Sequence, residues 1–179
     1  MTATSGVATS GATGAHLVPI GTVDRDAIEH LLDLAFGTDR HGRTAYRLRE
    51  GVLAEAGASC AALDETGRLV GSLQSWPLAL TDNDGVVTPL WLVGPIAVHT
   101  DRRNEGIGRA MLRRALDAID ATGIPAVLIG DAPYYAPFGF SADRTQRWIV
   151  PGPVDRARLL ARADADVALP VEGTLGPRG

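Results

Sequence analysis

The chain has 179 residues, of which 45% are hydrophobic and 21% are charged. These values are typical of one globular domain that is long enough to bury a single core. The formal net charge of -4 argues against a general nucleic-acid binder, because such proteins present a strongly basic face.

The cysteine and histidine content points away from a disulfide bond or a metal centre. Cys60 is the sole cysteine, which excludes an internal disulfide and favours a reducing compartment. It lies in an apolar run, so we expect a small buried side chain rather than a nucleophile. The four histidines show no ligand spacing with one another or with the cysteine, and we predict no metal site.

Residues 1–15 are almost all small or polar, which predicts a flexible tail rather than a signal peptide. No apolar run approaches the ~20 residues that a membrane helix needs. We therefore expect a cytoplasmic protein without a membrane partner.

From His16 onward the pattern predicts one alternating domain, residues 16–160, followed by a C-terminal extension, residues 161–179, to which we assign no role. Apolar periodicity and turn residues predict elements in this order: a strand over 16–20, a helix over 24–36, a shorter helix over 43–56 interrupted at Gly51, and strands over 60–63, 69–80 and 86–98.

The second half of the chain adds a strand–helix–strand unit. Apolar residues at helical spacing follow residue 107, Gly123 ends that helix, and a strand over 126–129 comes next. This last strand must run parallel to the strand ending at Val98, because a helical crossover separates them. The fold class is therefore α/β, with a mixed, mostly antiparallel central sheet flanked by helices.

The loop that opens this helix reads Arg103-Asn104-Glu105-Gly106-Ile107-Gly108. Two glycines allow a ligand to approach the backbone, and the positive end of the following helix favours a pyrophosphate. The dinucleotide fingerprint requires a small residue where this chain has Met111, and the Walker A loop requires Lys where it has Arg109. The loop therefore predicts a phosphate cradle of another kind.

Arg103 to Gly108 resembles the acetyl-coenzyme A loop of the GNAT superfamily of N-acetyltransferases at every fixed position. The strand Leu92 to Val98 is similar to the family's preceding strand, and the segment Tyr134 to Phe140 is similar to its closing Tyr-x-x-x-Gly-Phe motif. Residues 148–160 also resemble a group of small bacterial members. The likeness covers most of the chain from about residue 16.

The resemblance implies acetyl-CoA as co-substrate, with its pyrophosphate on the loop and its pantetheine arm along a splayed strand pair. Gly94-Pro95 supports the splay, since proline cannot donate a ladder hydrogen bond and a bulge or local separation is expected there. The residues expected to bind acetyl-CoA are Ile96, Ala97, Val98, Arg103, Asn104, Glu105, Gly106, Ile107, Gly108 and Arg109.

Acetyl transfer also requires an acid for the leaving thiolate and a base for the amine. Tyr135 matches the family's general-acid tyrosine, four residues before Gly139, whereas we take Tyr134 as a packing residue. The strand over 86–98 contains no carboxylate, although many relatives place a glutamate near it. Base candidates are Asp131, His99, Glu29, Asp33 and bulk water, and of these we assign Asp131.

An arginine-rich segment, residues 40–49, lies where such folds build the acceptor pocket. Arg43 and Arg47 are one helical turn apart, and a guanidinium recognises a carboxylate or phosphate in bidentate fashion. The alternative is a solvated basic face paired with Glu50. The sharper hypothesis predicts that replacing Arg43 or Arg47 raises the acceptor KM and leaves acetyl-CoA affinity unchanged.

Three functions from different classes remain open. The favoured one is an N-acetyltransferase that joins acetyl-CoA to a primary amine of a small molecule or protein, which would carry an anionic group under the arginine hypothesis. The second is a non-catalytic acyl-CoA-binding or sensing module, which the missing strand carboxylate supports. The third is a regulatory or nucleic-acid-associated protein, which the acidic balance makes the weakest. A homodimer is compatible with all three.

Overall fold

The structure is a computed structural model that describes residues 14–179. Residues 1–13, most of the expected flexible tail, lie outside the described residues. Within the described part of the chain, no helix is both long and apolar enough to cross a membrane.

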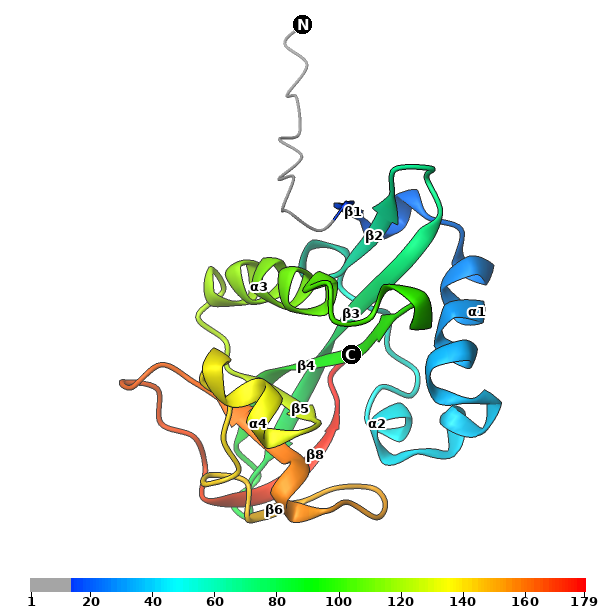
Figure 1. Cartoon of the computed structure of the whole chain (residues 1–179). Helices are drawn as coiled ribbons and strands as arrows, with labels where there is room; N and C mark the ends of the chain where they lie inside the picture. Colours follow the sequence, from blue (N-terminus) through cyan, green and yellow to red (C-terminus); the bar gives the residue numbers. More distant parts are fainter. Residues whose placement is uncertain (1–13) are drawn as a thin grey trace, which may run out of the picture.

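The chain alternates between strands and short or medium helices (Figure 1). In order, the elements are β1 (Ala15–Pro19), α1 (Arg25–Phe36), α2 (Thr44–Arg47), β2 (Cys60–Asp64), β3 (Leu69–Thr81), β4 (Val87–Val98), α3 (Ile107–Asp120), β5 (Ala126–Ile129), α4 (Ala132–Tyr135), β6 (Arg147–Ile149), β7 (Leu159–Arg162) and β8 (Glu172–Pro177).

The described strands form one eight-stranded open sheet in which β1-β2-β3-β4-β5-β7 are successive neighbours. The pairs β1–β2, β2–β3, β3–β4 and β5–β7 are antiparallel, whereas β4 and β5 are parallel. The mixed, mostly antiparallel sheet that the sequence predicts is therefore confirmed.

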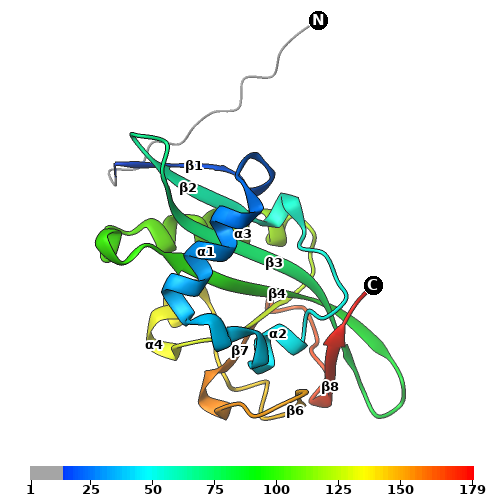
Figure 2. The same ribbon diagram turned by 90° about the vertical axis from the view of Figure 1, so that its right-hand side faces the viewer.

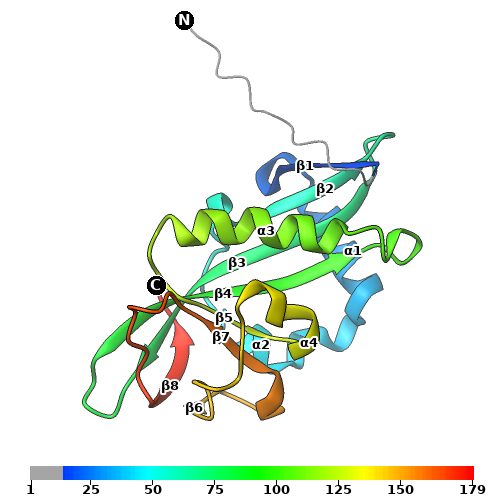
Figure 3. The ribbon, with the colours of Figure 1, turned by 60° about the vertical axis from the view of Figure 1, so that its left-hand side comes forward.

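Two amphipathic helices cover opposite faces of the sheet. In Figure 2 helix α1 lies in front of β3, and in Figure 3 helix α3 lies in front of it. Helix α1 begins at the N-cap Asp24, whose side chain accepts from the Asp26 amide, and buries Ile28, Leu31 and Leu32. Helix α3 presents its apolar face to the other side of the sheet, with Met111 and Leu112 fully buried.

A glycine in β3 brings α3 close to the sheet. A Cβ atom at Gly71 would lie 2.9 Å from Met111 Cε and 3.1 Å from Ile107 Cγ2. A larger residue at this position would force Met111 and Ile107 at the start of α3 to shift. This close packing fixes the N-terminal end of α3 against β3 and β4.

The C-terminal residues contribute to the sheet. Strand β8 pairs antiparallel with the end of β3 and parallel with β6 (Figure 3). Leu175 on β8 and Trp148 on β6 are buried in a second core cluster together with Leu78 and Leu80 of β3. Residues 161–179, to which the sequence analysis assigned no role, thus complete β7 and contribute β8 to the second core cluster.

The expected helix over 43–56 is wrong in its length. Helix α2 spans only Thr44–Arg47, and the chain then turns through Gly51, which adopts a φ of 75°. Leu48 is fully buried, but Leu53 is 84% exposed, so the segment lacks the apolar stripe of a longer helix. Glu55 instead bonds through its amide to the Ser75 carbonyl of β3.

Strand β4 carries the bulge that Gly94-Pro95 predicts. Ser75 pairs with Val93 and Leu73 pairs with Ile96, so β4 has one more residue than β3 between these positions. On its other edge β4 pairs with β5 only at Trp91 and Leu92, although β5 continues to Ile129. The two parallel strands therefore splay beyond Leu92, as expected.

Candidate active site

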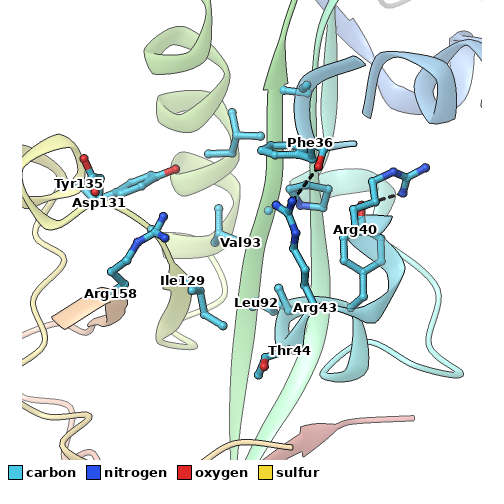
Figure 4. A pocket seen from close by; sticks show the side chains of 18 of the residues that line it. Phe36, Arg40, Arg43, Thr44, Leu92, Val93, Ile129, Asp131, Tyr135 and Arg158 are labelled. Carbon is cyan, nitrogen blue, oxygen red and sulfur yellow. Dashed lines mark hydrogen bonds between the residues drawn. The ribbon is translucent and has the colours of Figure 1, made fainter. Parts of the chain in front are cut away.

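A cavity of about 810 Å³ occupies the splay between β4 and β5. Figure 4 shows Tyr135, Asp131 and Arg158 on one side and Phe36, Arg40 and Arg43 on the other. Leu92, Val93 and Ile129 lie between these two groups. The cavity thus runs from the N-terminus of α3 to α2, and it joins two sets of residues that are far apart in the sequence.

The α3 end of the cavity has the geometry of a phosphate cradle. Gly106 is the N-cap of α3 with a φ of 80°, and Asn104 also adopts a positive φ of 67°. The first hydrogen bond of the helix runs from the Ala110 amide to the Gly106 carbonyl, at 3.0 Å. The amides of residues 107–109 precede that bond and remain available to an anion.

The loop before α3 is held by a network of ion pairs around Asp64, at the β2–β3 turn. This buried carboxylate accepts from the Thr66 hydroxyl and from the amides of Thr66 and Arg68. These hydrogen bonds lower the pKa of Asp64 to about 2. Arg102 lies 3.7 Å from the same carboxylate and also pairs with Glu105 at 2.8 Å. The network ties residues 102–105 to the sheet.

Backbone groups of β4 face the splay. The His99 amide donates to the Val70 carbonyl of β3, at 2.8 Å. Because hydrogen-bonding directions alternate along a strand, the amides and carbonyls of Val98 and Ile96 point away from β3 and toward the cavity. They can pair with an extended ligand that has its own amides, as an added strand would.

Tyr135 lies beside the splayed strands, at the end of α4. Its ring meets Phe140 edge-on with a centroid distance of 6.1 Å and packs against the main core. Burial raises the pKa of Tyr135 to about 12, and the neighbouring Tyr134 adds to the shift. The phenol therefore keeps its proton throughout the neutral range.

Gly130, directly after β5, fixes the position of Tyr135. A Cβ atom there would overlap the Tyr135 ring and would lie 3.1 Å from Leu128 Cδ1. The missing side chain lets the ring lie against the strand. Sequence reasoning missed Gly130, since nothing local distinguishes it from an ordinary turn glycine.

Tyr134 lies at the α3 end of the cavity. Its hydroxyl would be 3.0 Å from a Cβ atom at Gly108, and the Arg109 guanidinium lies 5.5 Å from its ring centroid. It is half-buried and lines the cavity. We expected Tyr134 to be a packing residue, whereas its hydroxyl lies beside Gly108 in the structure.

Of the carboxylates considered as bases, Asp131 lines the cavity. It precedes α4, is exposed, and its main-chain carbonyl accepts from the amides of Tyr134 and Tyr135. His99 lies 2.6 Å from Asp101, and Glu29 and Asp33 both pair with Arg40. Asp155, which the sequence did not single out, is a second carboxylate on the cavity wall.

The far end of the cavity is built by α2 and the loop 150–158. The Thr44 hydroxyl donates to the Pro153 carbonyl at 2.6 Å, and Arg47 Nη1 donates to the Pro151 carbonyl at 3.0 Å. Gly152 fits beneath α2, since a Cβ atom there would lie 2.6 Å from the Thr44 hydroxyl. These contacts clasp the loop 150–158 onto α2, although the two segments are about a hundred residues apart in the sequence.

The predicted acceptor arginines have different surroundings. Arg43 lines the cavity, and its Nη2 donates to the Phe36 carbonyl at 2.8 Å (Figure 4). Arg47 faces the loop instead and is not among the cavity residues. Arg40 is 1% exposed and is neutralised by Glu29 and Asp33.

The predicted acetyl-CoA residues also divide into two groups. Ile96, Ala97, Val98, Arg103 and Gly108 line the cavity. Ile107 is buried in the main core, and Asn104, Glu105, Gly106 and Arg109 belong to the loop and the first turn of α3 but are not among the residues that line the cavity. Within residues 14–179, no group of three or more His, Cys, Asp or Glu residues could hold a metal ion.

Comparisons with known proteins agree with this geometry. A family model described as an acetyltransferase (GNAT) domain matches residues 19–142. The uncharacterized N-acetyltransferase YhbS of Escherichia coli strain K12 is 30% identical over 121 residues, which cover 66% of this chain and 68% of that protein.

Solved structures share the fold. The E. coli GNAT family N-acetyltransferase YhbS, in complex with CoA, superposes with a TM-score of 0.70 at 23% identity and covers 95% of this chain and 93% of that one. A GNAT family acetyltransferase from Brucella melitensis, in complex with acetyl-CoA, gives 0.63 at 21% identity, covering 93% and 97%. The glycine loop, the splayed strands and the matched domain lead to one conclusion: the chain belongs to the GNAT family and is an acetyltransferase.

Proposed function

We propose that the enzyme transfers the acetyl group of acetyl-CoA to a primary amine by direct attack, without a covalent enzyme intermediate. The observation that carries this proposal is the continuous cavity, which joins the loop before α3, the β4–β5 splay and Tyr135. The CoA and acetyl-CoA complexes of the two structural neighbours support acetyl-CoA as the donor.

Acetyl-CoA would bind along the cavity in an extended conformation. The amides at the start of α3 would hold the pyrophosphate, with Arg103 on the cavity wall contributing positive charge. The pantetheine arm would pair with the Ile96 and Val98 backbone groups that face the splay. This arrangement would bring the thioester near the β4 bulge, beside Gly130 and Tyr135.

In the proposed reaction the neutral amine attacks the thioester carbonyl carbon, and a C–N bond forms. The carbonyl oxygen takes up the electron pair, and a β4 amide that faces the splay stabilises this oxyanion. Collapse of the tetrahedral intermediate then breaks the C–S bond and releases the CoA thiolate.

Tyr135 would act on the leaving sulfur. Because the pKa of its phenol is raised to about 12, the hydroxyl is protonated at neutral pH and donates to the departing thiolate. The Tyr135 phenolate would then regain a proton from water. The attacking nitrogen is positively charged in the tetrahedral intermediate and loses one proton before the C–S bond breaks. Asp131 lines the same cavity and would accept that proton directly or through water.

The test is an amine screen that follows CoA thiol release and confirms the acetylated product by mass spectrometry. The proposal predicts release that depends on an amine and products that carry one added acetyl group on nitrogen. Thiol release without an acetylated amine, at the same rate with and without acceptor, would contradict it.

A further inference from the structure

Arg49 has an unusual environment for a charged side chain. Its guanidinium lies 3.8 Å from the ring centroid of Tyr46 and 4.3 Å from that of Trp76, so the two rings flank it. Its Nη1 is shielded from solvent and has no hydrogen-bond partner among residues 14–179. A shielded donor of a cation without an acceptor is destabilising, and such groups normally have an anionic partner.

Arg40 is also shielded from solvent but, unlike Arg49, has anionic partners. Arg40 is flanked by Glu29 at 2.6 Å and Asp33 at 2.8 Å, and its Nη1 also donates to the Tyr46 hydroxyl at 2.7 Å. Arg49 makes no ion pair within the described chain. Burial lowers the pKa of Arg49, whereas Tyr46 and the charge of Glu29, which itself pairs with Arg40, shift it the other way.

The two rings that flank Arg49 are themselves held in place. Tyr46 accepts its hydrogen bond from the buried Arg40. Trp76 Nε1 donates to the Gly94 carbonyl at 2.9 Å, and Gly94 belongs to the β4 bulge beside the reaction site. The orientation of the guanidinium is thus fixed before any ligand arrives, which reduces the entropy lost on binding.

Arg49 lies in the acceptor part of the cavity. It lines the same cavity as Gly94 and Pro95, at the α2 end and away from the loop that opens α3. A molecule with an amine at the β4 bulge can therefore place a second group near Arg49. A planar guanidinium forms paired hydrogen bonds with a planar anion, and a carboxylate matches it best.

We propose that the acceptor is a small amine that carries a carboxylate, and that Arg49 binds this carboxylate between Tyr46 and Trp76. This inference rests on the proposed function and narrows its substrate class to amino carboxylates. It also assigns a specificity residue that differs from Arg43 and Arg47.

The experiment uses the full chain saturated with desulfo-CoA and measures acceptor binding by titration calorimetry. The probes are glycine, β-alanine and L-lysine, each compared with its carboxamide, which retains the amine but lacks the negative charge. At least one carboxylate should bind about tenfold or more tightly than its amide, as expected for a charged hydrogen-bonded pair.

Arg49→Met keeps much of the aliphatic stem and should reduce this preference to about one. Arg49→Lys keeps the charge without the planar fork and should retain only part of the preference, which gives a second test if the first variant folds poorly. The control is Arg25→Met, which removes an exposed arginine at the N-terminus of α1. This variant should preserve the preference for the carboxylate.

Equal binding of carboxylates and amides by the wild type, or a preference that survives Arg49→Met, would overturn the inference. Acetyl transfer that ignores the carboxylate would also overturn it while leaving the proposed function intact. Failure to bind acetyl-CoA, or to acetylate any amine, would instead count against the proposed function.

Discussion

Individual residues of the site differ in how far sequence could assign them. The proposed role of Tyr135 rests on its distance from Gly139 in the sequence, and the structure adds a reason for the phenol to stay protonated, namely its burial against the core. Tyr134 and Gly130 have no such sequence signal. Their roles depend on the packing of α4 against β5 and α3, which brings a hydroxyl to Gly108 and a ring to Gly130.

Tyr135→Phe should lower kcat by about a hundredfold, within the usual range for losing a general acid, and should leave acetyl-CoA affinity unchanged. Steady-state kinetics together with calorimetry separate the two effects. A comparable kcat loss in Tyr134→Phe, with Tyr135→Phe fully active, would show that the other tyrosine is the acid.

At the scale of elements, the strand–loop–helix unit could be predicted because its signals are local. Gly106 and the apolar stripe of α3 are continuous in sequence, and Gly94-Pro95 marks the bulge within one strand. The contact between Thr44 and Gly152 at the α2 end of the cavity could not be predicted, because it joins segments that are far apart in the sequence. The predicted longer helix at 43–56 failed since only its first turn has a buried partner surface.

Gly152→Ala tests whether the clasp between α2 and the loop 150–158 shapes the acceptor pocket. The added methyl would meet the Thr44 hydroxyl at 2.6 Å and should displace the loop, so we expect the acceptor KM to rise several-fold. Acetyl-CoA affinity should stay the same, since the clasp lies at the opposite end of the cavity.

The matched control for this variant is Gly21→Ala, which introduces the same methyl group into open space. It should preserve both acceptor KM and acetyl-CoA affinity. An unchanged acceptor KM in Gly152→Ala would show that the loop does not shape the pocket.

For the whole molecule, the Asp64 network links stability to pH. The folded-state pKa of about 2 lies below the ordinary aspartate value, so the carboxylate contributes stability that is fully present above about pH 4–5. This contribution is lost as pH falls toward the folded-state pKa. The loss should accompany loosening of the loop at residues 102–105 that precedes α3.

Asp64→Asn removes the titrating group and should flatten the pH dependence of stability. The measurement is urea unfolding of both proteins between pH 6 and pH 2, a window set by the shifted pKa of about 2. The wild type should be the more stable protein at pH 6, and the difference should shrink toward pH 2. A constant difference across this range would contradict the assigned role of Asp64.

The overall α/β architecture follows from the sequence, since periodicity and turn residues specify the order and direction of the central strands. The C-terminal strands β6, β7 and β8 could not be predicted from the sequence, because each is short and becomes buried only by pairing with distant strands. The match to the acetyltransferase (GNAT) domain model over residues 19–142 agrees with this architecture.

The most direct test of the account is acetyl-CoA binding by titration calorimetry to the wild type, Gly106→Ala and Gly123→Ala. Both glycines adopt positive φ, 80° at the start of α3 and 69° just beyond its end, so alanine imposes similar backbone strain of about 1–2 kcal/mol at each. The account predicts tight binding by the wild type and by Gly123→Ala and at least several-fold weaker binding by Gly106→Ala. No binding by the folded wild type, or equal affinity in all three proteins, would contradict the phosphate cradle at the start of α3.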